Sequence, residues 1–313
     1  MIMDLSVLLS NLIGLFLLIG VGFFAVRAGI LPAEASKPMT ALLMKITVPA
    51  TIVSSMLRPL DMGFLKMGAS MLLVGMVILP LFSVVSLGLS RLFRVADGRR
   101  GMWCFCATFC NSGFMGFPVA LALFGEEGLA LTVILSIPFN LMMYSIGAKM
   151  VCMDLPRDGS AQAISWGKVI FSVINLSLVV GLFFYFTQIQ LPQAVRGPLD
   201  YLAGVTIPLS MMITGMNLSQ GKAGDIFRDR DILTAAGTRL LILPVLAWGL
   251  MRLAPGLSSL VLGAALLNFS MPSPAAAALL GEQYGGDTQT AVRAVFVSSL
   301  LCIVTIPLVS LLL

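Results

Sequence analysis

Two short stretches place asparagine, serine, glycine and proline inside otherwise apolar sequence, and they hold the residues best suited to chemistry. The first covers residues 111–118 (NSGFMGFP) and the second covers residues 268–274 (NFSMPSP). Glycines and prolines at this density should break a helix. Broken backbone at membrane depth persists only where protein buries it or where it lines a watery cavity. Two such breaks in one chain therefore predict a solute-binding site.

The candidate substrate-binding residues are the amide, hydroxyl, glycine and proline positions of both stretches: Asn111, Ser112, Gly113, Gly116, Pro118, Asn268, Ser270, Pro272 and Ser273. Pro118 and Pro272 are predicted to start the second half of each broken helix, because the first helical turn tolerates a missing N–H. Those half-helix N-termini would offer free N–H groups and partial positive charge, which suit an anion. The alternative is an ordinary proline kink with asparagines that bridge helices.

Lys45 and Arg239 are the two charges within the long apolar segments. Each lies about seven residues from a segment end, or roughly 10 Å deep at 1.5 Å per residue. Cations at such depth are costly and usually functional, so both are candidates for binding an anionic substrate. The alternative for each is that its long side chain snorkels to the membrane surface.

Missing residue types narrow the chemistry further. The chain has no histidine, and its 14 Asp and Glu residues fall outside the middle of the apolar segments. The usual carriers of an intramembrane proton relay and the usual general bases are therefore lacking. Five cysteines lie in or beside apolar sequence without a CxxC pair, which favours packing roles over a metal site. We expect no cofactor, no metal and no enzymatic activity, with sodium-coupled or uncoupled transport left open.

The elements that must position these residues are membrane-spanning helices. The chain has 313 residues, of which 58% are hydrophobic and 11% charged, too few charges to cover a soluble globule. An all-α polytopic membrane protein is predicted, and its net charge of +5 needs no nucleic-acid partner. Ten apolar segments stand out: Leu5–Val26, Pro38–Leu57, Met67–Ser90, Gly101–Gly125, Gly128–Ala148, Val169–Leu191, Tyr201–Gln220, Ile232–Met251, Leu257–Gly281 and Ala294–Leu313.

Charge bias predicts the orientation in a cell (inner) membrane. With the N-terminus outside, the cytoplasmic connections hold 13 Lys and Arg residues and the outer connections hold 4. Positive charge gathers on cytoplasmic loops, so both termini are predicted on the outer side.

The two halves of the chain carry matching text. Val21-Gly22 matches Val180-Gly181, and residues 47–49 (TVP) match residues 206–208 (TIP), both at an offset of 159. Five spans in each half would insert the second half from the opposite side. The sequence thus predicts two inverted repeats, residues 1–155 and 156–313, a construction typical of secondary transporters.

The run from Asn111 to Gly128, NSGFMGFPVALALFGEEG, resembles the signature of the auxin efflux carrier family. That family includes plant PIN-type auxin carriers and bacterial permeases for malate or malonate. Similar text recurs near Pro49 and Pro208, at residues 239–244 (RLLILP) and at residues 271–287.

The resemblance implies ten helices in two inverted five-helix repeats, with spans four and nine crossed at their breaks. It also implies scaffold and transport domains, an elevator mechanism and a homodimer. It transfers a role to Asn111, Gly113, Gly116, Pro118, Asn268, Pro272 and Arg239, and it adds Asn140 in an IPFN stretch. Two departures are the short connection between spans five and six and the second proline of the PSP motif.

These observations predict a secondary carrier for a small organic anion, either a dicarboxylate or an auxin-like monocarboxylate. One alternative is a sodium-coupled symporter for a larger amphipathic acid, similar to relatives of bile-acid symporters. A more remote alternative is an intramembrane enzyme or sensor, for which no catalytic set is present.

Overall fold

The computed structural model describes residues 5–155, 173–220 and 228–313, and these residues form helices and connections without any strand. Seven helical stretches in this part are long and apolar enough to cross a membrane. They are Ser10–Arg27, Ala33–Met56, Met62–Leu92, Arg100–Asp154, Gln193–Ser219, Arg230–Leu253 and Thr288–Ser310. Val173–Thr187 and Ser259–Phe269 are shorter apolar helices. The all-helical, multi-pass class is confirmed, whereas the division into ten spans and the inverted repeat stay predictions.

The first half of the chain contains α1 (Leu5–Arg27), α2 (Ser36–Leu42), α3 (Val48–Met56), α4 (Met62–Leu92), α5 (Arg100–Thr108), α6 (Phe117–Met142) and α7 (Ala148–Val151). Within α6 the backbone kinks at Gly125, whose φ of 66° is open to glycine. This kink falls on the last residue of the predicted fourth segment, Gly101–Gly125.

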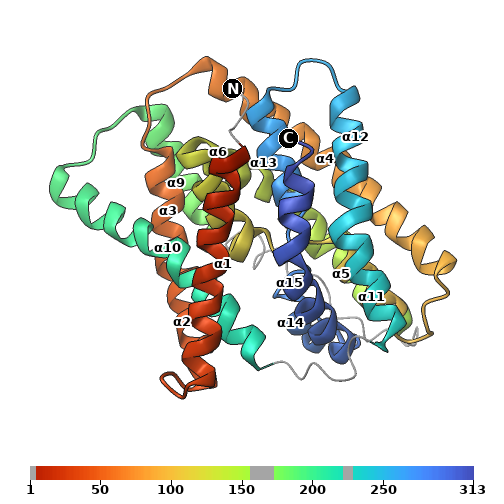
Figure 1. The fold of residues 1–313 in the computed structure, drawn as a ribbon. Coiled ribbons are helices and arrows are strands. Elements are labelled where there is room, and N and C mark those ends of the chain that lie inside the picture. Colours follow the sequence, from red (N-terminus) through yellow and green to blue (C-terminus); the bar gives the residue numbers. More distant parts are fainter. Residues whose placement is uncertain (1–4, 156–172, 221–227) are drawn as a thin grey trace.

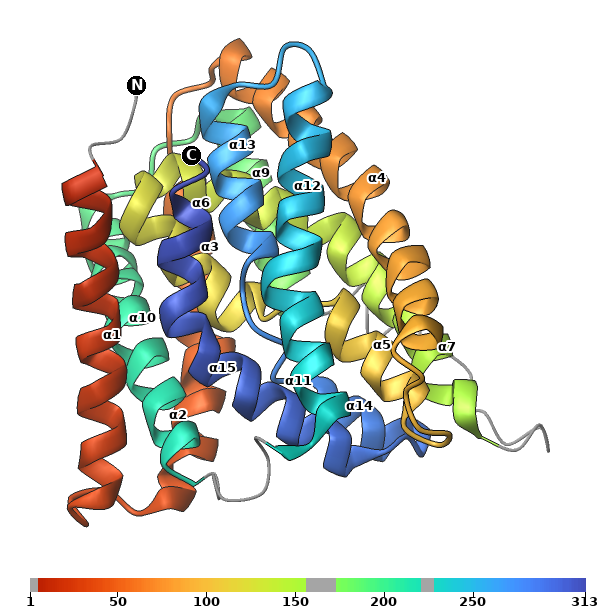
Figure 2. The same ribbon diagram turned by 45° about the vertical axis from the view of Figure 1, so that its right-hand side comes forward.

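The second half contains α9 (Val173–Thr187), α10 (Gln193–Ser219), α11 (Arg230–Gly237), α12 (Leu243–Leu253), α13 (Ser259–Phe269), α14 (Ala277–Tyr284) and α15 (Thr288–Ser310). The predicted sixth segment begins outside the described residues. Figures 1 and 2 show that α1 begins, and α15 ends, at the same end of the molecule.

Three π-helical turns explain how prolines fit inside long helices. The turns Leu43–Thr47, Ser112–Gly116 and Thr238–Ile242 each continue directly into an α-helical stretch whose second residue is proline. Those prolines are Pro49, Pro118 and Pro244. Proline lacks an N–H and its ring collides with the carbonyl four residues earlier, so a wider turn relieves the collision. The helix keeps its direction, while the backbone hydrogen bonds within the turn join residues five apart instead of four.

Glycines allow close helix packing in two places. A Cβ atom on Gly215 of α10 would lie 1.9 Å from the carbonyl oxygen of Ile19, and one on Gly22 of α1 would lie 2.0 Å from that of Met212. Gly181 of α9 likewise faces Met56 of α3, where an added Cβ would approach to 2.9 Å. Small residues of this kind let membrane helices approach at backbone distance. The α1–α10 and α3–α9 pairs therefore form tight contacts beside the site.

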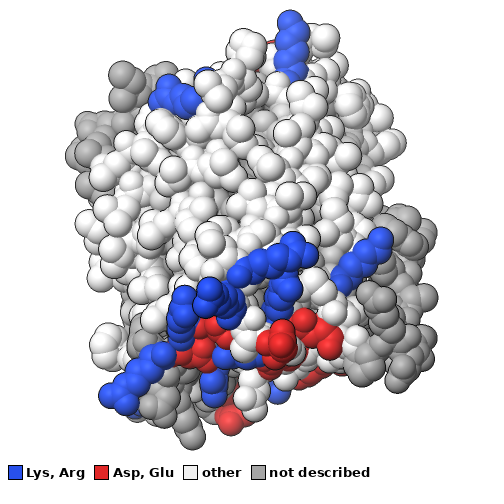
Figure 3. All heavy atoms as spheres, turned by 90° about the vertical axis from the view of Figure 1, so that its right-hand side faces the viewer, with Lys and Arg blue, Asp and Glu red and all other residues white. Residues whose placement is uncertain are grey.

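On the face shown in Figure 3, the charged side chains gather toward the two ends of the molecule and the surface between them is uncharged. At one end Arg99 pairs with Asp229 at 2.7 Å, with Asp231 at 3.3 Å and with Asp287 at 3.7 Å. At the other end Arg58 pairs with Glu127 at 3.1 Å. We call the end that contains Arg99 the charge-rich end. An uncharged surface between two charged ends is what a bilayer core requires.

Candidate functional site

The two predicted breaks meet in the middle of the molecule. α5 ends at Thr108 and α13 ends at Phe269, and these helices approach from opposite ends of the fold (Figures 1 and 2). The backbone N–H of Asn111 donates to the carbonyl oxygen of Pro272 at 2.7 Å. The two irregular segments are thus joined directly by backbone, and we call this meeting point the crossover.

Side chains strengthen the same junction. Asn268, which is 2% exposed, donates from Nδ2 to Oγ of Ser112 at 2.8 Å. Its Oδ1 accepts from the thiol of Cys110 at 3.5 Å. A Cβ on Gly116 would lie 2.7 Å from Nδ2 of Asn268, so glycine at position 116 leaves room for this amide. One buried asparagine therefore bridges both broken helices.

The half-helices do not start at the predicted prolines. After Asn111, whose φ and ψ are −80° and 62°, the chain re-enters helix at Ser112, six residues before Pro118. The π-helical turn places Pro118 one turn inside the helix instead of at its start. In the other break the helix resumes at Ala277, where the N–H donates to the carbonyl of Pro274 at 2.9 Å. The second proline of the PSP motif, and not Pro272, precedes this start.

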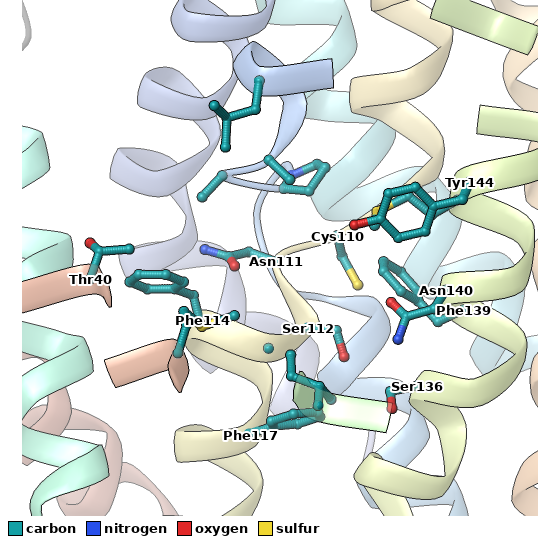
Figure 4. Close-up of a pocket in the computed structure, with 18 of the residues that line it drawn as sticks. Thr40, Cys110, Asn111, Ser112, Phe114, Phe117, Ser136, Phe139, Asn140 and Tyr144 are labelled. Carbon is teal, nitrogen blue, oxygen red and sulfur yellow. The ribbon is translucent and has the colours of Figure 1, made fainter. Parts of the chain in front are cut away.

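A cavity of ≈ 380 Å³ lies against the crossover. Figure 4 shows Asn111 and Ser112 between a group containing Thr40 and Phe114 and a group containing Ser136 and Asn140. Its wall comprises Thr40, Met44, Cys110, Asn111, Ser112, Gly113, Phe114, Phe117, Ser136, Phe139, Asn140, Met143, Tyr144, Ile174, Asn217, Pro274, Ala275, Ala276 and Leu279. Asn217 and Leu279 are exposed and lie on parts of α10 and α14 near the charge-rich end, so the cavity extends toward that end.

The cavity wall carries no Asp, Glu, Lys or Arg among the described residues. Its polar groups are neutral amides and hydroxyls, and its remaining surface is aromatic or aliphatic. Backbone N–H groups of residues 112–114 belong to the first turn of a helix and lack intrahelical partners. The wall can therefore donate hydrogen bonds to an anion without presenting a full positive charge.

Arg239 neither lines this cavity nor snorkels, contrary to both alternatives drawn from the sequence. It is 0% exposed, and its guanidinium donates to the carbonyls of Ala107 at 3.3 Å, of Thr108 at 2.6 Å, and of Phe269. These carbonyls belong to the C-terminal ends of α5 and α13, and Ala107, Thr108 and Phe269 do not line the cavity. Lys45 is exposed and outside the wall, whereas its neighbour Met44 lines the cavity.

The remaining predicted residues divide between the cavity and the packing around it. Asn140 lines the cavity and donates to Oδ1 of Asn175 at 3.3 Å. Ser270 is buried and donates to the carbonyl of Leu266 in its own helix. Ser273, also buried, donates to the carbonyl of Cys106 at 2.9 Å and so joins the two breaks. Asn111, Ser112, Gly113 and Asn140 are thus the predicted residues that the structure brings together around the cavity.

Comparison with known proteins decides the family. The sequence profile of a family described as "Membrane transport protein" matches residues 7–162 and 159–310. The chain belongs to this family. The resemblance to the auxin efflux carriers is thereby confirmed, and this membrane transport protein is similar along almost its whole length to other transporters.

Three curated relatives can be named. An uncharacterized transporter of Methanocaldococcus jannaschii is 27% identical over 303 residues, which cover 93% of this chain and 94% of that protein. An uncharacterized transporter of Methanothermobacter thermautotrophicus is 25% identical over 300 residues, 96% of each chain. A putative malonate transporter of Rhizobium meliloti is 21% identical over 294 residues, 93% of this chain and 91% of that protein.

Sequence reasoning did not find much of the cavity wall of this transport protein. Thr40 and Met44 come from the second apolar segment, Tyr144 from the fifth and Asn217 from the seventh. A polar residue inside an apolar segment was the available signal for Asn217 and Thr40. No pattern distinguishes Met44 or the aromatic residues from lipid-facing residues, because these segments are apolar on every side.

Proposed function

We propose that this transport protein is a carrier that binds a small organic anion in the cavity at the crossover. The observation that carries the proposal is the cavity itself, which borders both broken helices and is lined by neutral hydrogen-bond donors. Broken helices near the midplane are the usual binding elements of secondary transporters. Its volume of ≈ 380 Å³ lies within the range typical of small-molecule sites.

The anionic character of the solute rests on the donors in the wall. Asn111, Ser112 and Asn140 offer side-chain donors, and Ser112, Gly113 and Phe114, whose N–H groups have no partner within the helix, line the same space. A carboxylate accepts such hydrogen bonds, and helix N-termini favour negative charge. The relative described as a putative malonate transporter supports an organic acid as the substrate class.

Transport then requires alternating access, and an elevator-type movement of the crossover helices is our proposed mechanism. The cavity extends toward the charge-rich end, which the charge bias assigns to the cytoplasm. The state described here is accordingly an inward-facing one within the proposal. The proposed architecture for this movement has ten spans in two inverted repeats. Gly22 and Gly181 support the repeat, because these matched positions both allow close helix packing. A homodimer remains part of the same proposal.

The aromatic wall favours a second candidate solute. Phe114, Phe117 and Phe139 give the cavity an apolar surface, which a dicarboxylate as small as malonate would leave unused. A larger amphipathic acid would cover these rings with its hydrocarbon part and place its carboxylate at Asn111 and Ser112. Within this alternative the carrier is a sodium-coupled symporter.

One screen tests both candidates. Purified protein is heated with malate, malonate, succinate, lactate or indole acetic acid, once in sodium and once in choline salts. A bound acid raises the melting temperature by mass action, and proteoliposome uptake of that acid confirms transport. Stabilisation by small dicarboxylates in both salts supports the first candidate, and stabilisation by larger acids in sodium alone supports the second. Absence of any acid-dependent shift or uptake contradicts the proposed function.

A further inference from the structure

Arg239 is a fully buried charge whose partners are all backbone oxygens. Among the described residues no carboxylate pairs with it, and its hydrogen bonds go to Ala107, Thr108 and Phe269. Removal of an unpaired charge from water is very costly, so buried charges are normally paired or coordinated. The three carbonyls must therefore supply the compensation that a carboxylate would otherwise provide.

All three carbonyls lie at the buried C-terminal ends of helices. Ala107 and Thr108 are the last residues of α5, and Phe269 is the last residue of α13. Terminal carbonyls have no intrahelical partner, and each helix end carries a partial charge of roughly −0.5. Two such ends together oppose about one positive charge. The Phe82 ring, 5.6 Å from the centre of the guanidinium, adds an aromatic face to the same pocket.

We propose that the ends of α5 and α13 form a monovalent-cation site that Arg239 fills with its own guanidinium. The chain carries the cation covalently, so the crossover assembles without a metal ion at this position. Rings of carbonyl oxygens replace the hydration shell of a small cation in membrane proteins, which is the chemistry this cluster offers. When the arginine is truncated, the vacated site should take free guanidinium.

Occupation of this site also positions the solute-binding residues. Phe269 directly follows Asn268, and Thr108 precedes Asn111 by three residues, so one guanidinium fixes the backbone beside both asparagines. Without a cation, two negative helix ends would face each other across an apolar pocket and would separate. This positioning role rests on the proposed function, whereas the cation site itself does not.

The experiment compares Arg239→Ala with the wild type and with Arg252→Ala. Arg252 lies on the same span, is exposed and stacks on Trp248, so its removal deletes one charge without touching the crossover. Thermal unfolding is measured without solute, in guanidinium chloride and in choline chloride at equal low ionic strength. We expect guanidinium to raise the melting temperature of Arg239→Ala alone. At ten times its dissociation constant it should increase the ratio of folded to unfolded protein about elevenfold.

Equal melting temperatures of Arg239→Ala in the two salts would overturn the proposal, and so would an equal rise in all three proteins. If Arg239→Ala does not fold, Arg239→Lys and Arg239→Gln decide. Lysine keeps the charge and glutamine keeps neutral donors, so the lysine variant should be the more stable. A glutamine variant as stable as the lysine variant, or more stable, would overturn the proposal.

Solute binding provides the second measurement. Guanidinium should restore the solute affinity of Arg239→Ala toward the wild-type value, which a generally loosened fold would not show. Stabilisation by guanidinium without restored affinity retains the cation site and rejects the positioning role. If the wild type binds none of the acids, the proposed function fails while the unfolding comparison still decides the cation site.

Discussion

The two sides of the crossover treat the ends of the broken helices in opposite ways. On the buried side three C-terminal carbonyls of α5 and α13, those of Ala107, Thr108 and Phe269, accept hydrogen bonds from the guanidinium of Arg239. On the cavity side the chain re-enters helix at Ser112 and Ala277, and the residues at these starts border open space. The negative ends are thus saturated by the protein itself, whereas the positive ends keep hydrogen-bonding capacity for a solute.

This difference assigns the two sides separate tasks: the buried side holds the broken helices together, and the cavity side binds the solute. The guanidinium of Arg239 bonds to backbone carbonyls and does not line the cavity. The cavity wall is therefore neutral, and it favours an anion through hydrogen-bond donors and helix N-termini. A neutral wall holds an anion less tightly than a buried cation would, and a carrier has to release its solute as well as bind it. Asn268 connects the two sides. The next residue in the sequence, Phe269, accepts a hydrogen bond from Arg239, and the side chain of Asn268 donates to Ser112, which lines the cavity.

The largest effect is expected for Asn268→Ala, because it damages both sides at once. The variant removes the donor to Ser112 and the acceptor of the Cys110 thiol, both in buried surroundings. Hydrogen bonds to a charged solute are worth about 1.5–3 kcal/mol, so loss of an ordered site should weaken binding about a hundredfold. The melting temperature should fall as well. Solute affinity and thermal unfolding of the purified variant measure the two effects.

Asn11→Ala is the matched control, since Asn11 also joins two helices by donating to the carbonyl of Ala122 at 3.2 Å, outside the cavity wall. It should lower the melting temperature without changing solute affinity. Unchanged affinity in Asn268→Ala would show that the crossover is only a kink between packed helices.

Asn111→Ala should weaken binding with little loss of stability. Its contact with the opposite break is a backbone bond to Pro272, which alanine retains, while its side chain faces the cavity. Loss of one hydrogen bond to a carboxylate predicts about a ten- to hundredfold fall in affinity. A titration of the solute against purified variant and wild type provides the measurement, and a large fall in melting temperature without a change in affinity would contradict it.

The two breaks and the position of Asn111 in the cavity wall were predicted from the residues themselves, whereas the contact between the breaks was implied by the family resemblance. The sequence did not predict the partners of Arg239, because its carbonyl acceptors lie more than one hundred residues away in Ala107 and Thr108. It placed the helix starts at the prolines because a π-helical turn leaves no signal beyond the proline itself. Lys45 and Met44 show the same limit, since an apolar segment does not reveal which of two neighbours faces a cavity.

Ser112→Ala should have a smaller effect, because the backbone N–H groups of the same helix start remain available to the carboxylate. The serine hydroxyl accepts from Nδ2 of Asn268 at 2.8 Å, and its loss leaves that buried amide without its acceptor. A neutral hydrogen bond is worth about 0.5–1.5 kcal/mol, so affinity should fall about two- to tenfold. Ser270→Ala is the matched control, since its hydroxyl bonds only to Leu266 of its own helix. Equal losses of affinity in both variants would contradict a specific role for Ser112.

The smallest effect is expected from pH, and it tests whether the cavity side is truly neutral. No Asp, Glu, Lys or Arg lines the described cavity wall, and its titratable residues are Cys110 and Tyr144. Thiols and phenols ordinarily titrate above about pH 8, so nothing in this wall should change charge between about pH 5 and 7. Affinity for a sulfonate analogue, whose own charge is constant over this range, should therefore remain constant. Calorimetric titration across the range measures it, with a carboxylic acid of ordinary pKa as the comparison. A tenfold step for the sulfonate would place a titrating group at the site, and the contrast between a charged buried side and a neutral cavity side would then be wrong.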